Sequence, residues 1–152
     1  MRLLVIQPTR TNAHFVFFLA EFLDGLFNML SDGNREIRQA ADSALAEFLQ
    51  EIKDSEVVSF GPMVDILITQ CDSKERFNRL TAAGWVQEFI NLGKEKLILF
   101  YADLLGAIMH CISDAEYEIC AVAEQANQDL LELVKVSVVF GGCAKSFRGL
   151  TS

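Results

Sequence analysis

The feature that most restricts the fold of this chain is an internal repeat with a fixed step of 41 residues. Phe48 corresponds to Phe89 and then to Leu130, and the apolar positions around them keep the same spacing without any insertion. A supersecondary unit of this size cannot bury its apolar face alone, so neighbouring units must stack on one another. The repeat therefore predicts a row of three similar elements with a shared core.

Each unit has the pattern of two helices joined by a short turn. Between Ile37 and Ile52, apolar residues recur at steps of three and four, while acidic residues lie off this stripe. The chain has only two prolines, and helix-favouring residues fill the segments between turns. We predict an all-α fold, an α-solenoid of three helical hairpins. The predicted helices are 18–30, 35–53, 62–71, 75–92, 97–112 and 116–135.

The turns inside the hairpins carry residues that start helices. A side-chain oxygen just before a helix can accept a hydrogen bond from an unpaired backbone N–H of its first turn. The expected N-cap residues are Ser31, Asp72 and Ser113. Glu75 and Glu116 stand three residues after the second and third of these, which predicts two capping boxes. Asn34 takes the equivalent place in the first unit.

One bulky aromatic interrupts a run of small residues. Trp85 stands where the other two units have Ala44 and Ala126. We expect Trp85 to fill a local gap in the core, the alternative being an exposed aromatic that binds a partner. Phe48, Phe89 and Leu130 are expected at the centre of the core.

The stretch 26–45 follows the spacing LLxxLxDxxxxIRxxAxxAL, with Asp32 and Arg38 at its two polar positions. This spacing resembles the HEAT repeat, so the resemblance implies that the three hairpins are of the HEAT type. The aspartate recurs as Asp114 and the arginine as Arg79. The departures from the pattern are Ser73 in the second unit and Cys120 in the third.

In HEAT proteins these polar residues form a ladder between neighbouring repeats. The resemblance therefore implies that Arg79 lies within reach of Asp32, of Asp114, or of both. The alternative is a clamp for a phosphate or an acidic motif, made from Arg38 and Arg79.

Composition argues against several classes of function. The formal net charge of −8 opposes binding to nucleic acid or to anionic lipid. The four cysteines form no C-x-x-C pair and the chain has only two histidines, so we expect neither a metal site nor a cofactor. Buried free thiols, in a reducing compartment, are the preferred interpretation. His110 and Cys111 are adjacent on a helix and point apart, which makes a nucleophile pair unfavourable.

Two segments could meet a membrane. The basic turn of Lys74, Arg76 and Arg79 has acidic neighbours, and the aromatic run Phe15–Phe18 is better explained as a helix that stacks on a repeat. No apolar run is long enough for a signal peptide or a membrane span, so we expect a soluble protein.

Three longer stretches, 23–53, 80–90 and 124–134, resemble the vacuole-morphology family of HEAT-repeat scaffolds. In that family a long scaffold assembles the kinase that makes phosphatidylinositol 3,5-bisphosphate together with a Sac-type phosphatase. The resemblance implies a non-catalytic segment on the cytoplasmic face of endosomal and vacuolar membranes. It also implies peripheral attachment through these two partners, with self-association left open.

The resemblance covers residues 18–135, whereas 1–17 and 136–152 do not continue the repeat. Members of the family are far longer, so we expect the chain to be an internal fragment with non-repeat flanks. Two other hypotheses remain. One is a generic HEAT adaptor, like a transport receptor or a phosphatase subunit, and the other is an enzyme with unrecognised chemistry, which would need a pocket of convergent polar groups.

Overall fold

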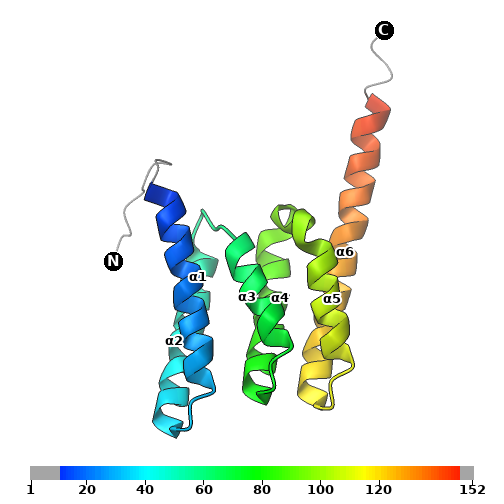
Figure 1. Cartoon of the computed structure of the whole chain (residues 1–152). Helices are drawn as coiled ribbons and strands as arrows, with labels where there is room; N and C mark the ends of the chain where they lie inside the picture. The colour runs from blue at the N-terminus through cyan, green and yellow to red at the C-terminus, as the bar shows by residue number, and fades with distance from the viewer. Residues whose placement is uncertain (1–10, 148–152) are drawn as a thin grey trace. The chain divides into compact units, whose positions relative to one another are not determined.

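A computed structural model describes the backbone of residues 11–147 and the side chains of residues 19–139. Within these residues the chain is helical and contains no strand, which confirms the all-α prediction. The elements are α1 (Thr11–Leu30), α2 (Arg35–Asp54), α3 (Gly61–Cys71), α4 (Arg76–Gly93), the 3-10 helix η1 (Lys94–Phe100), α5 (Tyr101–Ile112) and α6 (Tyr117–Phe147) (Figure 1).

The helices form hairpins at the predicted step. The turns at 31–34, 72–75 and 113–116 join α1 to α2, α3 to α4 and α5 to α6. The chain divides into two compact units, residues 1–66 and 67–152, with the division inside α3.

In the first unit, α1 packs against α2. Leu23 and Phe27 of α1 and Ala41 and Leu45 of α2 are almost completely buried. These residues recur at the spacing of one helical face, so the hairpin forms because each helix offers an apolar stripe to the other.

In the second unit, α6 packs against both α4 and α5. Phe89 and Ile90 of α4, Leu104 of α5 and Ile119 of α6 are buried among these helices. The 3-10 helix η1 contacts α4, α5 and α6, and its Leu97 is fully buried. Two helical layers thus share one core in this unit.

The helices differ from the sequence-based bounds by more than one residue at three places. α1 begins at Thr11 and α6 continues to Phe147, so both extend beyond the predicted repeat. The predicted helix 97–112 is two elements, because the chain passes through Lys94 at φ 44° and forms η1 before α5 begins. An apolar repeat marks the face that needs a neighbour, whereas helical hydrogen bonding can continue past that face.

The prediction of N-caps at Ser31, Asp72 and Ser113 is wrong. The Ser31 and Ser113 hydroxyls donate to carbonyls of the preceding helix, on Asn28 and Met109. The N-caps of α2 and α4 are Asn34, whose Oδ1 accepts from the N–H of Glu36, and Glu75, which makes no such bond.

The expected capping boxes are therefore not formed. The physical reason is the length of the turn. The serines still belong to the last turn of one helix, and the next helix begins four residues later.

Candidate functional site

The three turns inside the hairpins share one hydrogen-bond pattern. In each turn a side-chain oxygen accepts from the backbone N–H two residues later. The pairs are Asp32 with Asn34 at 2.7 Å, Ser73 with Glu75 at 3.2 Å, and Asp114 with Glu116 at 2.9 Å. Such turns are favoured by Asp and Ser because their short side chains reach the following backbone. The pattern fixes the direction in which each second helix starts.

In each hairpin a side chain of the second helix donates a hydrogen bond to a backbone carbonyl of the turn. Arg38 donates from Nη1 to the carbonyls of Asp32 and Gly33, at 2.8 and 3.0 Å. Arg79 makes the matching bonds to the carbonyls of Ser73 and Lys74, at 3.1 and 3.0 Å. In the third turn the Cys120 thiol donates to the carbonyl of Asp114 at 3.0 Å. The arginine position thus stabilises its own turn.

Arg79 also joins the second hairpin to the third. Its Nε lies 2.7 Å from Oδ2 of Asp114 and its Nη2 lies 3.2 Å from Oδ1, a two-pronged contact. The two side chains are 16% and 6% exposed, so water screens the pair weakly. The contact raises the pKa of Arg79 and lowers the pKa of Asp114. The pair remains ionised over the whole physiological range.

Further polar contacts between α4 and α6 continue this line. Arg76 pairs with Glu116 at 3.0 Å and with Glu118. Farther along the helices, Gln87 and Asn91 donate to Asp129 at 3.5 and 3.1 Å. The donors are on α4, and the acceptors are on α6 or in the turn before it. We name this set of contacts, from Arg76 to Asp129, the α4–α6 polar edge.

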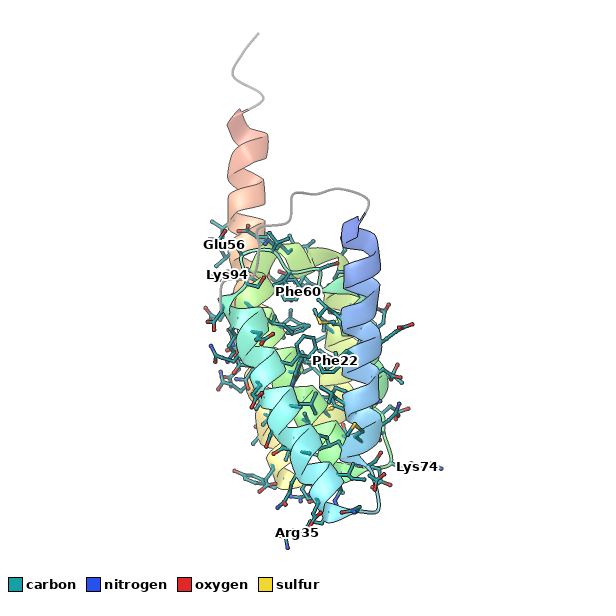
Figure 2. All side chains as sticks on the ribbon, turned by 90° about the vertical axis from the view of Figure 1, so that its left-hand side faces the viewer. Phe22, Arg35, Glu56, Phe60, Lys74 and Lys94 are labelled. Atoms are coloured by element: carbon teal, nitrogen blue, oxygen red, sulfur yellow. The ribbon has the colours of Figure 1, made fainter. Side chains whose placement is uncertain are left out.

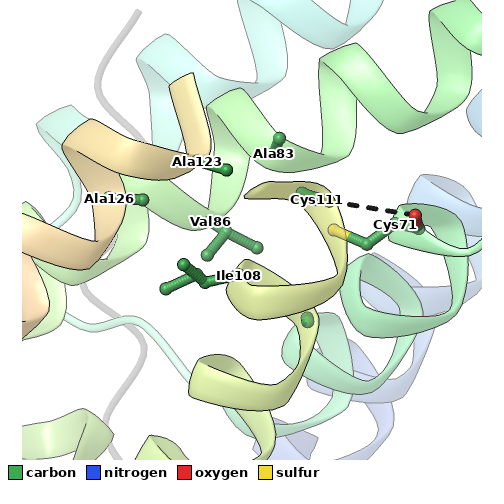
Figure 3. A pocket seen from close by; sticks show the side chains of 8 residues that line it. Cys71, Ala83, Val86, Ile108, Cys111, Ala123 and Ala126 are labelled. Atoms are coloured by element: carbon green, nitrogen blue, oxygen red, sulfur yellow. Dashed lines mark hydrogen bonds between the residues drawn. The ribbon is translucent and has the colours of Figure 1, made fainter. Parts of the chain in front are cut away.

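Beside the polar edge lies an apolar layer. Its residues come from α3, α4, α5 and α6 (Figure 3). They are Cys71, Ala83, Val86, Ala107, Ile108, Cys111, Ala123 and Ala126. The space between them has no room for a water molecule and is lined by no charged group. Such a layer holds helices together and offers no place for a substrate.

The cysteines of this layer are free thiols. The Cys111 thiol points to the carbonyl of Cys71 at 3.9 Å, as the dashed line in Figure 3 shows. Contact with the Cys111 thiol, together with burial, raises the pKa of Cys71 far above its ordinary range. Cys71 is therefore a poor nucleophile. Cys143 lies outside the side chains described.

The remaining candidates for chemistry are dispersed. His110 pairs with Asp72 at 3.1 Å on the surface, and His14 and Phe15–Phe18 lie outside the side chains described. Among the described residues no three metal-binding side chains come together. Within the same part of the chain, no helix has both the length and the apolar character needed to cross a bilayer.

The apolar positions predicted from the repeat are buried. Phe48, Phe89 and Leu130 are 7%, 0% and 3% exposed. Trp85 is 3% exposed, and its ring centre lies 5.8 Å from that of Phe89. Trp85 is therefore part of the core and is not displayed as a binding aromatic.

The polar positions are divided between local and longer-range roles. Arg79 meets Asp114, whereas Arg38 bonds to its own turn and Asp32 accepts from Asn34. Arg38 and Arg79 thus each hydrogen-bond to the carbonyls of their own turn.

Sequence reasoning missed several polar contacts of the second unit. Arg76, Gln87, Asn91 and Asp129 were not predicted to meet, and buried Asn78 donates to Gln70 at 2.9 Å. The sequence carries a weak signal for these contacts, since a cation or an amide on α4 lies about one repeat step before each carboxylate partner. The separations are 35, 38, 40 and 42 residues, so they scatter around the repeat step of 41.

One curated relative covers much of this chain. Protein VAC14 homolog of Arabidopsis thaliana is 57% identical over 113 residues, which are 74% of this chain and 15% of the relative. No protein-family profile matches the chain, and no solved structure matches it. The match spans a small part of the relative, so it describes a segment. The resemblance to the vacuole-morphology scaffold family is confirmed, and this chain carries a VAC14-type segment.

Proposed function

We propose that this chain is a non-catalytic scaffold segment that helps to assemble a lipid-kinase complex. The partners would be a phosphatidylinositol 3-phosphate 5-kinase and a Sac-type phosphoinositide phosphatase. The single observation that carries the proposal is the 57% identity to Protein VAC14 homolog over most of the chain. In this role the segment would affect both synthesis and turnover of phosphatidylinositol 3,5-bisphosphate by holding the two enzymes together.

The geometry of the second unit supports a scaffold role. Its polar side chains pair across helices, as Arg79 and Asp114 do, and its apolar layer excludes water. Paired polar side chains and a dry apolar layer keep a surface rigid, but they do not bring together the groups needed for proton or phosphoryl transfer. Rigid surfaces suit docking, because little conformational entropy is lost on binding.

The proposal places the chain at the cytoplasmic face of endosomal or vacuolar membranes, attached through its partners. The net charge of −8 disfavours direct adsorption to anionic lipid. We also propose residues 18–135 as the functional repeat segment, with 1–17 and 136–152 as flanks.

The test is a binding assay with purified components. The tagged chain is immobilised and offered the recombinant kinase and the recombinant phosphatase, separately and together, with retention measured by quantitative blotting. The matched control is the Phe89→Ala variant, which should lose the fold but keeps the surface charges. Retention of either enzyme by the wild-type chain, and not by the control, is expected.

Retention of neither enzyme by a chain shown to be helical and cooperatively folded would overturn the proposal. Capture of a transport cargo or of an unrelated phosphatase core, in a parallel experiment with cell extract, would favour the generic adaptor instead.

A further inference from the structure

Two thiols of the second unit lie against each other although they come from different hairpins. Cys71 is the last residue of α3, and Cys111 is the next-to-last residue of α5, 40 residues farther along the chain. The Cys111 Sγ lies 3.9 Å from the carbonyl oxygen of Cys71, and the two thiols also contact each other. In Figure 3 the Cys71 side chain extends from α3 toward α5. The fold thus brings together a pair of sulfur atoms.

The surroundings of this pair are apolar. Cys71 and Cys111 are 2% and 1% exposed, and the other residues that line the layer are alanine, valine and isoleucine. A thiol is a weak hydrogen-bond donor, and a contact of 3.9 Å is long, so the two S–H groups contribute little by hydrogen bonding. A disulfide bond carries no polar hydrogen. Its formation here would therefore leave no strong donor buried without a partner.

Both thiols are buried but lie next to the surface along the chain. Asp72 directly follows Cys71, and its side chain is 82% exposed. His110 directly precedes Cys111, and its side chain is 56% exposed. Each cysteine is in the last turn of its helix, and helix ends open more readily than helix centres. Local opening of these two turns would admit a small oxidant without unfolding the unit.

We propose that Cys71 and Cys111 form an oxidation site, at which a peroxide converts the two thiols into a disulfide bond. The bond would tie the end of α3 to the end of α5, and so join the second hairpin covalently to the third. In a reducing compartment such a bond lasts only while the oxidant is present, which makes the link reversible. This inference goes beyond the proposed function and does not depend on which enzymes the chain holds.

The two thiols are suited to different steps of the reaction. A hydrogen bond from the Cys71 thiol lowers the pKa of Cys111, and the same contact together with burial raises the pKa of Cys71. The Cys111 thiolate therefore attacks an oxygen of the peroxide. An S–O bond forms, the O–O bond breaks, and hydroxide leaves, so that Cys111 becomes a sulfenic acid.

Cys71 completes the reaction. Its sulfur attacks the Cys111 sulfur, the S–S bond forms, and the S–O bond breaks. The departing hydroxide takes the Cys71 proton and becomes water. With hydrogen peroxide as the oxidant, two thiols are oxidised to one disulfide while one peroxide is reduced to two water molecules.

The test uses the full chain with Cys120→Ser and Cys143→Ser, which leaves Cys71 and Cys111 as its only thiols. Serine at position 120 keeps a donor for the carbonyl of Asp114. The folded, reduced chain is treated with hydrogen peroxide, alkylated, and digested with trypsin without reduction. Mass spectrometry should show the tryptic fragments 54–74 and 97–135 linked, and the intact chain lighter by two hydrogen atoms. Dithiothreitol should restore both thiols.

Thermal unfolding tests whether the bond fits the native structure. A link across 40 residues restricts the unfolded chain, so oxidation should raise the midpoint by about 5 °C or more, and dithiothreitol should remove the increase. The matched controls are Cys71→Ala and Cys111→Ala in the same background. Each control keeps one thiol, so peroxide treatment should give no internal link and no increase in the midpoint.

Circular dichroism before oxidation establishes that the starting chain is folded. If the serine variant does not fold, the wild-type chain gives the same answer, because cleavage after Glu116 or Glu118 separates Cys111 from Cys120. Two thiols that stay open to alkylation, under conditions that fully oxidise free glutathione, would overturn the proposal. A link that forms only in urea, joins two molecules, or lowers the midpoint would also overturn it. None of these results depends on whether the kinase or the phosphatase binds.

Discussion

The first and third hairpins place similar residues at equal steps along the chain, yet one is covered and the other is not. The Asp114 carboxylate pairs with Arg79, whereas the Asp32 carboxylate accepts from the backbone N–H of Asn34 in its own turn. Leu104 is buried and Phe22, which packs its ring edge on Phe48, is half-exposed (Figure 2). The repeat therefore predicts which type of residue is found at equivalent positions of the hairpins. Whether that residue is buried or paired depends on the hairpin that packs against it.

The largest loss of stability should come from equivalent positions that are buried in both hairpins. Phe48 and Leu130 are both buried, so truncating either one leaves a cavity in the core of its unit. We expect Phe48→Ala to cost about 3–5 kcal/mol and Leu130→Ala about 2–5 kcal/mol in urea unfolding. A loss under about 1 kcal/mol at either residue would break the comparison, because the shared register would then not define a shared core.

The next prediction concerns Asp114 and Asp32, which take equivalent positions but have different partners. Asp114→Asn keeps an oxygen for the N–H of Glu116 but removes the charge that Arg79 requires. We expect a loss of about 2 kcal/mol at neutral pH. Asp32→Asn, which has no ion pair to lose, should cost less than about 0.5 kcal/mol. Equal losses in urea titrations of the two variants would contradict the assigned roles.

The Asp114 effect should also depend on pH. The pKa of Asp114 is lower in the folded chain than in the unfolded chain, because Arg79 stabilises the carboxylate. Its contribution is therefore complete above the unfolded pKa and is lost as the pH falls through the folded value. The difference between wild type and Asp114→Asn should shrink below about pH 4. A difference that stays constant down to pH 2 would mean that the charge contributes nothing.

The connections between hairpins differ as well. Ser55 leaves α2 in an extended conformation, whereas Lys94 leaves α4 at φ 44° and ψ −121°, a region that side chains disfavour. Replacing Lys94 with glycine removes that steric cost. We expect Lys94→Gly to stabilise the chain by about 1 kcal/mol in thermal unfolding. Destabilisation would show that the lysine side chain supports η1.

The sequence predicts a structural feature more reliably when a longer segment of the chain specifies that feature. Helix pairing and the core extend over whole repeats, so Phe48, Phe89 and Leu130 could be identified as interior. An N-cap depends on two or three atoms in a turn, and the side chain that caps α2 is Asn34 and not the predicted Ser31.

Contacts between hairpins depend on the rotation of one helix about another. The HEAT resemblance offered Asp32, Asp114 or both as partners of Arg79, and the structure pairs it with Asp114. Spacing along one helix cannot reveal that Arg76 meets Glu118 or that Asn91 meets Asp129. The positive φ of Lys94 was equally invisible, because a lysine gives no turn signal.

The smallest expected effect tests whether the surface of the first hairpin around Met29 is open in the isolated chain. Met29 is 42% exposed, while its counterpart Cys111 is 1% exposed in the apolar layer. We expect Met29→Gln to change unfolding free energy by about 0.5 kcal/mol or less, because the amide stays hydrated. Cys111→Ser should cost more, since it buries a hydroxyl in an apolar layer. If Met29→Gln costs as much as Cys111→Ser, the surface around Met29 is already covered in solution, and the two hairpins differ less than their exposures indicate.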